Sequence, residues 1–194
     1  MSSPRILVIS SSTRPGRIGP AVATWLAAAI EADGRFAVDL ADLAELNLPL
    51  MDEPNHPRQR RYVHDHTKAW SARVDAADAF FVITPEYNHS FPASIKNAVD
   101  YLHHEWANKP VAFASYAGVS GGLRAVTALK PVFTALRAMP IPEGVVIPNV
   151  FAQLSDGAFT PSGPNLEGLG LALDELARWT PALRVLRTGV AQAA

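Results

Sequence analysis

The sequence predicts one α/β domain over residues 1–194, a five-stranded doubly wound parallel sheet with helices on both faces. Five short apolar runs alternate with helix-like stretches, and this alternation is typical of right-handed βαβ units. Several of the runs are continuous rather than alternating in polarity, as expected for strands buried on both faces. A length of 194 residues with 48% hydrophobic residues is enough for one continuous core.

The first half of the chain supplies the first two strands. RILVIS at 5–10 is apolar and bounded by polar residues, so it predicts a buried strand. From Ile18 onward, apolar residues recur at helical spacing, and Pro20 lies near the first turn, where proline is tolerated. FAVDLADL at 36–43 predicts the second strand, and a polar connection rich in proline then leads to a helix expected at 59–77.

Three further strands and three helices are expected in the rest of the chain. The strands are expected at 79–87, stopped by Pro85, and at 109–118 and 142–150. The helices are expected at 92–104, 122–139 with an internal proline, and 166–186. Glycine, proline and serine between 149 and 165 predict a loop.

Composition excludes several classes of function. The formal net charge of -1 offers no basic surface for nucleic acid. The longest apolar stretch, AVATWLAAAI, is too short to cross a bilayer, and no signal peptide is recognised. The absence of cysteine excludes disulfides and thiolate chemistry. We therefore expect a cytoplasmic protein without membrane insertion.

Three loops that follow the first, third and fourth expected strands form the candidate site. They read SSSTRPGRIG, PEYNHSFP and SYAGVSGG, and all are rich in small polar residues or glycine. Ligands of doubly wound sheets bind beyond the carboxyl ends of the strands, so the three loops are expected to share one rim.

The first loop predicts an anion site. A helix N-terminus presents unpaired N–H groups and the positive end of the helix dipole. Ser11, Ser12 and Thr13 add hydroxyl donors, and Arg14 and Arg17 add guanidinium groups suited to phosphate. The glycine patterns of dinucleotide-binding and nucleoside-triphosphate-binding loops are both absent, which favours a single terminal phosphate. The alternative is that the hydroxyls cap the helix and the arginines are solvated.

Together the loops resemble the NADPH-dependent FMN reductase family of flavodoxin-like proteins, which includes quinone and azo reductases. The matching stretches are SSTRPGR with VATW, PEYNHSFPASIKNAVDYL, and KPVAFASYAGVSGGLRA, and they extend over about residues 5–142. The resemblance implies a flavodoxin-like fold that binds FMN. Ser11 and Ala117 depart from the family pattern, which commonly has glycine at both positions.

The same resemblance implies the residues that bind the cofactor. The flavin phosphate would be held by the first loop, and the isoalloxazine would lie against the other two loops. The implied cofactor-binding residues are Ser12, Arg14, Arg17, Ile18, Gly19, Pro85, Glu86, Tyr87, Asn88, Ser90, Ser115, Tyr116 and Gly118. No protein side chain is expected to act as the catalytic group, because the flavin N5 carries the hydride.

The resemblance implies an FMN-dependent oxidoreductase that passes hydride from NADPH or NADH to a small acceptor. The acceptor would be a quinone, a flavin, an azo compound or a metal complex, and no residue in the sequence decides among these. The sequence also does not decide between NADPH and NADH. The alternative is a flavodoxin-like electron carrier or a redox-sensing FMN-binding protein. Electron carriers of this kind tend to be strongly acidic, whereas this chain is nearly neutral.

Two other chemistries are less well supported by the sequence. Ser120 stands in a G-x-S-x-G pattern between a strand and a helix, as in serine hydrolases, but every histidine precedes it, contrary to the hydrolase order. His64 and His66 are expected to point in different directions around a helix, so no metal site is predicted. His89 is the one histidine expected near the flavin, with an undetermined role.

The chain is expected to form a homodimer or homotetramer, as the resemblance implies. Ile95, Val99 and Leu102 fall on one stripe of the helix at 92–104, with Tyr101 and Trp106 adjoining it. This stripe would contact either a second subunit or the sheet of the same chain.

Overall fold

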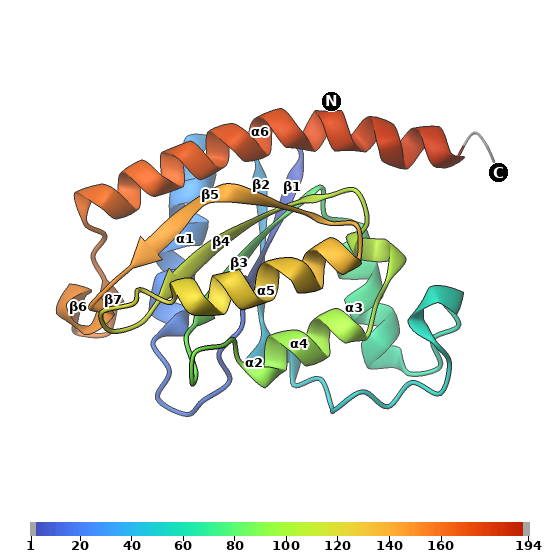
Figure 1. Ribbon diagram of the computed structural model, residues 1–194, viewed down its shortest axis with the longest axis horizontal. Helices are drawn as coiled ribbons and strands as arrows, with labels where there is room; N and C mark the ends of the chain where they lie inside the picture. Colours follow the sequence, from blue (N-terminus) through green and yellow to red (C-terminus); the bar gives the residue numbers. More distant parts are fainter. Residues whose placement is uncertain (1–2, 192–194) are drawn as a thin grey trace.

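A computed structural model describes residues 3–191 and confirms the predicted fold class. Five parallel strands form one sheet in the order β2-β1-β3-β4-β5 (Figure 1). The chain therefore reverses its direction of winding between β1 and β3. The strands are β1 (Arg5–Ser10), β2 (Ala37–Asp42), β3 (Ala79–Pro85), β4 (Pro110–Tyr116) and β5 (Met139–Ile147).

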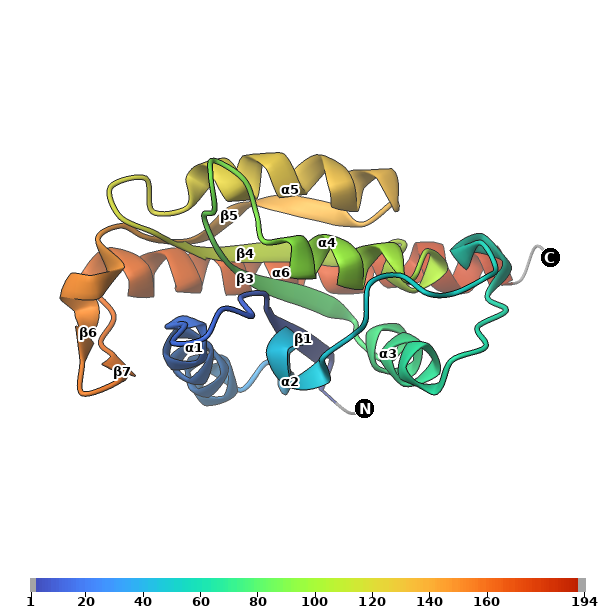
Figure 2. The same cartoon turned by 90° about the horizontal axis from the view of Figure 1, so that it is seen from below.

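Helices on both faces of the sheet enclose two separate apolar cores. The helices are α1 (Gly19–Asp33), α2 (Leu43–Leu46), α3 (Asp65–Asp75), α4 (Ala93–Asp100), α5 (Leu123–Ala135) and α6 (Gly163–Ala191). One core joins α1 and α6 to the sheet, and the other joins α3, α4 and α5 to its opposite face. The long α6 runs along one side of the molecule, and α4 and α5 lie on the other (Figures 1 and 2). No helix in residues 3–191 combines the length and apolarity that a membrane crossing requires.

The expected helix at 59–77 is wrong at its start, because α3 begins only at Asp65. A short 3₁₀ helix at Pro57–Gln59 ends where Arg60 adopts a left-handed φ of 50°. Arg60 then reaches the buried carboxylate of Glu105, which lies in a second 3₁₀ helix at His104–Trp106, beyond the end of α4. The contact between Arg60 and Glu105 therefore holds this segment in a non-helical conformation.

The predicted loop at 149–165 is more ordered than expected. It contains a 3₁₀ helix at Val150–Gln153 and a two-stranded ribbon of β6 (Leu154–Ser155) and β7 (Ala158–Phe159). Asp156 and Gly157, with φ of 51° and 78°, form the turn between these strands. The ring of Phe159 packs against Trp25 of α1, with the ring centroids 5.1 Å apart, so the ribbon is attached to the body of the domain.

The two edges of the sheet differ in chemistry. β5 begins three residues earlier than predicted and contains Pro140 and Pro142, which an edge strand tolerates because it has no outer hydrogen-bonding neighbour. On the opposite edge, Arg73 of α3 pairs with Asp39 of β2 at 2.6 Å and also donates to the Leu40 carbonyl. At both edges of the sheet, therefore, some outward backbone groups are missing or already bonded, and cannot pair with another strand.

The apolar stripe of α4 is buried inside the chain. Ile95, Val99 and Leu102 are all fully or almost fully buried in the core that α4 shares with α3 and α5, as are Tyr101 and Trp106. Of the two alternatives for this stripe, packing on the chain's own sheet is confirmed. The stripe gives no support to association.

A buried lysine joins the start of β4 to the end of α3. The Lys109 ammonium donates to the Val74 and Asp75 carbonyls, both at 2.9 Å, and its side chain lies in the interior. These carbonyls belong to the last turn of α3, where the helix itself offers no donors. Burial, opposed by the charges of Asp75 and Asp78, lowers the pKa of Lys109 to about 8.

This lysine gives a testable dependence of stability on pH. Between the folded pKa of about 8 and the ordinary value of 10.5, the unfolded chain binds more protons than the folded chain, so stability rises with pH. Lys109 should contribute a gain of about 3 kcal/mol across that window. Urea unfolding at both ends of the window should show the stability of the parent rising by this amount relative to that of Lys109→Met, because the tyrosines that also titrate there are common to both proteins. The exposed Lys68→Met should behave as the parent, and equal gains in all three proteins would contradict the assignment.

Candidate functional site

A cavity of about 230 Å³ lies where the three predicted loops meet, beyond the carboxyl ends of β1, β3 and β4. Eight of the thirteen predicted cofactor-binding residues line it. They are Ser12, Arg14, Ile18, Pro85, Glu86, Tyr87, Tyr116 and Gly118. The predicted common rim of the loops is thus present in the structure.

The first loop leaves its donors available to a ligand. The N-cap residue of α1 is Ile18, and no side chain caps the helix, so the capping alternative for the loop hydroxyls is wrong. Within the described residues, the backbone N–H groups of Gly16 and Gly19 have no hydrogen-bond acceptor. Arg14 forms no ion pair with any described residue, in contrast to many arginines of this chain. The loop therefore offers N–H groups and a positive charge that are not neutralised internally.

Arg17 has a different environment from Arg14. Its guanidinium pairs with the carboxylate of Asp42 at 2.9 Å, and Asp42 also accepts a hydrogen bond from the Ala44 backbone at the start of α2. Arg17 does not line the cavity. In this structure it joins the first loop to the end of β2.

Hydroxyl groups from all three loops gather at the cavity. The Ser12 and Tyr87 hydroxyls are 2.7 Å apart, so the first and second loops are hydrogen-bonded to each other. Tyr116 of the third loop lies beside Gly19, where a Cβ would stand 3.0 Å from the Tyr116 hydroxyl. Burial raises the pKa of Tyr116, so its phenol stays protonated and remains a hydrogen-bond donor at neutral pH.

The second loop is held by a tight turn. Asn88 and His89 both have positive φ, of 50° and 65°, and the backbones of Tyr87 and Ser90 exchange two hydrogen bonds across them. Positive φ at two successive central positions is the signature of a type I′ turn. The turn fixes the direction of Tyr87, whereas Asn88 and Ser90 themselves do not line the cavity.

Glu86 connects the second loop to the third. Its buried carboxylate accepts hydrogen bonds from Ser120 at 3.0 Å and from the Arg124 guanidinium at 2.6 Å. Burial raises the pKa of Glu86, but these hydrogen bonds and the Arg124 charge more than offset burial, so the net pKa lies below its usual range. The carboxylate is therefore ionised at neutral pH and forms a fixed part of the cavity wall.

Ser115 is separated from the other predicted residues. It lies one position before Tyr116 on β4, and successive side chains of a strand point to opposite faces of the sheet. Ser115 accordingly lines a different cavity, between α5 and β5.

The chain's similarity to known proteins agrees with this geometry. The sequence model of the NADPH-dependent FMN reductase family matches residues 4–152. The chain belongs to this family. It is 38% identical over 150 residues to an NAD(P)H-dependent FMN reductase of Schizosaccharomyces pombe (strain 972 / ATCC 24843), which covers 75% of this chain and 74% of the relative. An NADPH azoreductase of Bacillus sp. (strain OY1-2) is 30% identical, over 77% of this chain and 79% of the relative.

Solved structures confirm the flavodoxin-like fold of this FMN reductase family member. The flavoenzyme NAD(P)H:(acceptor) oxidoreductase FerB from Paracoccus denitrificans superposes with a TM-score of 0.71 at 23% identity. The comparison covers 92% of this chain and 98% of FerB. Membership of the family makes the chain an oxidoreductase, as the sequence predicts.

A fourth segment, which was not among the predicted site residues, also lines the cavity of this FMN reductase family member. Val150 and Phe151, just after β5, also line the cavity, and Phe151 is 70% exposed. Backbone hydrogen bonds from Asn149 to Gly118 and from Val150 to Ala117 hold this segment against the third loop. This segment could have been predicted from the sequence. Ligands of doubly wound sheets bind beyond the carboxyl ends of the strands, and the segment follows the carboxyl end of β5.

The structure does not support the serine hydrolase alternative for this family member. The Ser120 hydroxyl donates to Glu86 and accepts from the Gly122 backbone, and within residues 3–191 no histidine is hydrogen-bonded to it. Ser120 is thus part of the connection between the second and third loops.

The expectation that His64 and His66 diverge is wrong. Their rings stack with centroids 5.2 Å apart, and both bond to Asp52, because His64 precedes α3 as its N-cap residue. No group of three or more histidine or acidic residues in the described part of the chain is arranged to hold a metal ion.

Proposed function

We propose that the chain binds FMN in the cavity formed by the three loops and passes hydride from NADPH or NADH to a small acceptor. The observation that carries this proposal is the meeting of Ser12, Arg14, Tyr87 and Tyr116 at the carboxyl edge of the sheet. The acceptor is a quinone, a flavin, an azo compound or a metal complex, since the similar proteins include FMN, quinone and azo reductases.

The first loop fits the phosphate of FMN. Arg14 supplies a positive charge without an internal counter-ion, and Ser12 supplies a hydroxyl within the same cavity. The buried hydroxyl of the neighbouring Ser11 also has no hydrogen-bond partner among the described residues, although Ser11 does not line the cavity. A phosphate ester is the ligand that such a set of donors binds well. Arg17, already paired with Asp42, would act by holding the loop in shape.

The second and third loops fit the isoalloxazine ring. Pro85, Tyr87 and Tyr116 supply flat surfaces to the cavity. The Tyr87 and Ser90 N–H groups already bond within the turn, so the N–H groups of this loop left to meet the ring are those of Glu86, Asn88, His89 and Phe91. Donors at this position would favour negative charge on the reduced ring. Bound FMN would supply the hydride exchange itself, and the protein would supply binding and orientation.

The first test is the visible absorption spectrum of the purified protein, before and after FMN and then NADPH are added without oxygen. We expect the bands of oxidised flavin to shift on binding and to bleach when NADPH is added. Turnover with a quinone and no partner protein would separate an enzyme from an electron carrier. A protein that leaves the FMN spectrum unchanged would contradict the proposal.

Assembly and location are tested separately from chemistry. A homodimer or homotetramer is proposed from the family resemblance, and sedimentation of FMN-loaded protein as a 20.8 kDa monomer would contradict it. A cytoplasmic location is an expectation that cell fractionation would test.

A further inference from the structure

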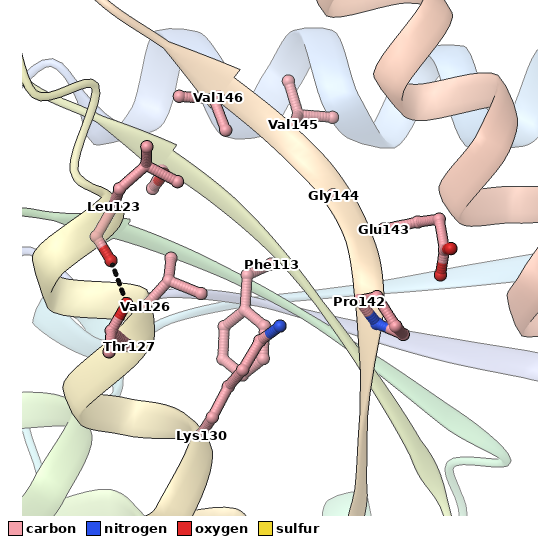
Figure 3. A pocket seen from close by; sticks show the side chains of 11 residues that line it. Phe113, Leu123, Val126, Thr127, Lys130, Pro142, Glu143, Gly144, Val145 and Val146 are labelled. Atoms are coloured by element: carbon pink, nitrogen blue, oxygen red, sulfur yellow. Dashed lines mark hydrogen bonds between the residues drawn. The ribbon is translucent and has the colours of Figure 1, made fainter.

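A second cavity, of about 260 Å³, lies between α5 and β5 (Figure 3). Phe113 and Ser115 of β4 line it, together with Leu123 and Val126 of α5 and Val146 of β5. We call it the α5–β5 groove. The third loop separates it from the proposed FMN cavity, because Ser115 and Tyr116 are adjacent on β4 and face opposite sides of the sheet.

The groove exists because the outer strand is poorly covered on this face. Ile141, Val145 and Ile147 of β5 are buried against the α1 and α6 side. The alternate positions Pro142, Gly144 and Val146 therefore face α5. Gly144 provides no side chain to fill the space, and a Cβ there would stand 2.5 Å from the Phe113 carbonyl oxygen. Val146 consequently remains 38% exposed although it belongs to the central sheet.

Two polar groups, the Ser115 hydroxyl and the Lys130 ammonium, lie among the apolar residues of the groove without a hydrogen-bond or ion-pair partner among the described residues. The Ser115 side chain is 1% exposed, and its hydroxyl has no hydrogen-bond partner among the described residues. A buried hydroxyl without a partner is destabilising unless a ligand or water completes it. Lys130 extends from α5 in the direction of Pro142 on β5 (Figure 3), and no acidic group of the described residues forms an ion pair with it.

One acidic residue also borders the groove, but its carboxylate is directed away. Glu143 points to the side of β5 that faces α6 (Figure 3). It also lines a separate cavity there, together with Arg35 and Asp174. The charge presented to the α5–β5 groove is therefore the positive charge of Lys130.

We infer that the α5–β5 groove binds a small amphipathic carboxylate. An aromatic or aliphatic body would displace water from Phe113, Leu123 and Val146, which is favourable for apolar surface. The carboxylate would pair with the Lys130 ammonium, and the Ser115 hydroxyl would donate to a polar atom of the ligand. The inference does not depend on FMN binding, because none of these groups lines the FMN cavity.

The test is a titration of the ¹⁵N-labelled protein with 3-phenylpropanoate, and separately with its neutral amide, followed by backbone amide shifts. We expect saturable shifts confined to 113–115, 123–130 and 142–146. The carboxylate should bind roughly tenfold more tightly than the amide, the effect of one charge-assisted hydrogen bond. Lys130→Met should remove this preference and leave amide binding unchanged.

Two further variants distinguish binding from damage to the fold. Ser115→Ala should weaken binding of the carboxylate without lowering the melting temperature, because it removes an unpaired hydroxyl. Lys68→Met, a lysine on α3, is the matched control and should bind as the parent does.

Three outcomes would overturn the inference. The first is equal affinity for the carboxylate and the amide, and the second is shifts that map elsewhere on the protein. The third is a dimer that Val146→Glu dissociates, which would show that a second copy of the chain covers the groove.

Discussion

Replacing Ser12 and Arg14 together by alanine should weaken FMN binding by about 100-fold. The arginine would lose a charge-assisted hydrogen bond to the phosphate and the serine a neutral one, together about 3 kcal/mol. Arg14 has no internal counter-ion to release when the ligand binds, so its full attraction is available. Titration of apoprotein into FMN, followed by the quenching of flavin fluorescence, measures the change directly.

The control for this prediction is a double replacement away from the cavity. Ser155→Ala with Arg178→Ala removes the same two residue types from the ribbon and from α6. FMN affinity should be unchanged in this control. An unchanged affinity in the Ser12 and Arg14 variant, with its melting temperature retained, would mean that the first loop does not hold the phosphate.

The second large effect concerns stability. Glu105 is fully buried, and its carboxylate accepts hydrogen bonds from Arg60, Tyr62, Ser71 and the His103 backbone. Glu105→Ala should lower the free energy of unfolding by about 3 kcal/mol, because several part-buried donors lose their common acceptor. Urea unfolding measures the loss.

Two observations would check that the carboxylate itself is responsible. The exposed Glu45→Ala should change stability by less than about 0.5 kcal/mol. Burial raises the pKa of Glu105, but the hydrogen bond from Ser71 and the charge of Arg60 more than offset this, so the net pKa is lowered. The contribution of Glu105 should therefore be present above the ordinary pKa of a glutamate and be lost at lower pH. A loss in Glu105→Ala of similar size to that in Glu45→Ala would contradict this role.

Most of the fold could be predicted because its signals are local. The buried strands are continuous apolar runs, and the start of α1 follows from helical spacing and from Pro20. The start of α3 could not be predicted in this way. It depends on Arg60 reaching Glu105, 45 residues later, and such a contact leaves no trace in spacing.

The site could be predicted at the level of loops and less well at the level of side chains. The three loops meet as the strand order requires, and Ser12 and Tyr87 touch across them. Ser115 and Tyr116 were both predicted to bind the cofactor, although alternation along β4 sends them to opposite faces of the sheet. Phe151 was missed because the segment after the fifth strand was not counted among the loops of the site, although it too follows the carboxyl end of a strand.

The edges of the sheet have a consequence for how molecules of this chain meet. An unpaired edge strand is a template on which a strand of another molecule can add, and growth of this kind leads to aggregation. Here Pro140 and Pro142 remove donors from β5, and Arg73 occupies the Leu40 carbonyl of β2 at the other edge. We therefore expect subunits to associate through side-chain surfaces rather than through a continuous intermolecular sheet, so that the native protein is protected against fibrillar growth.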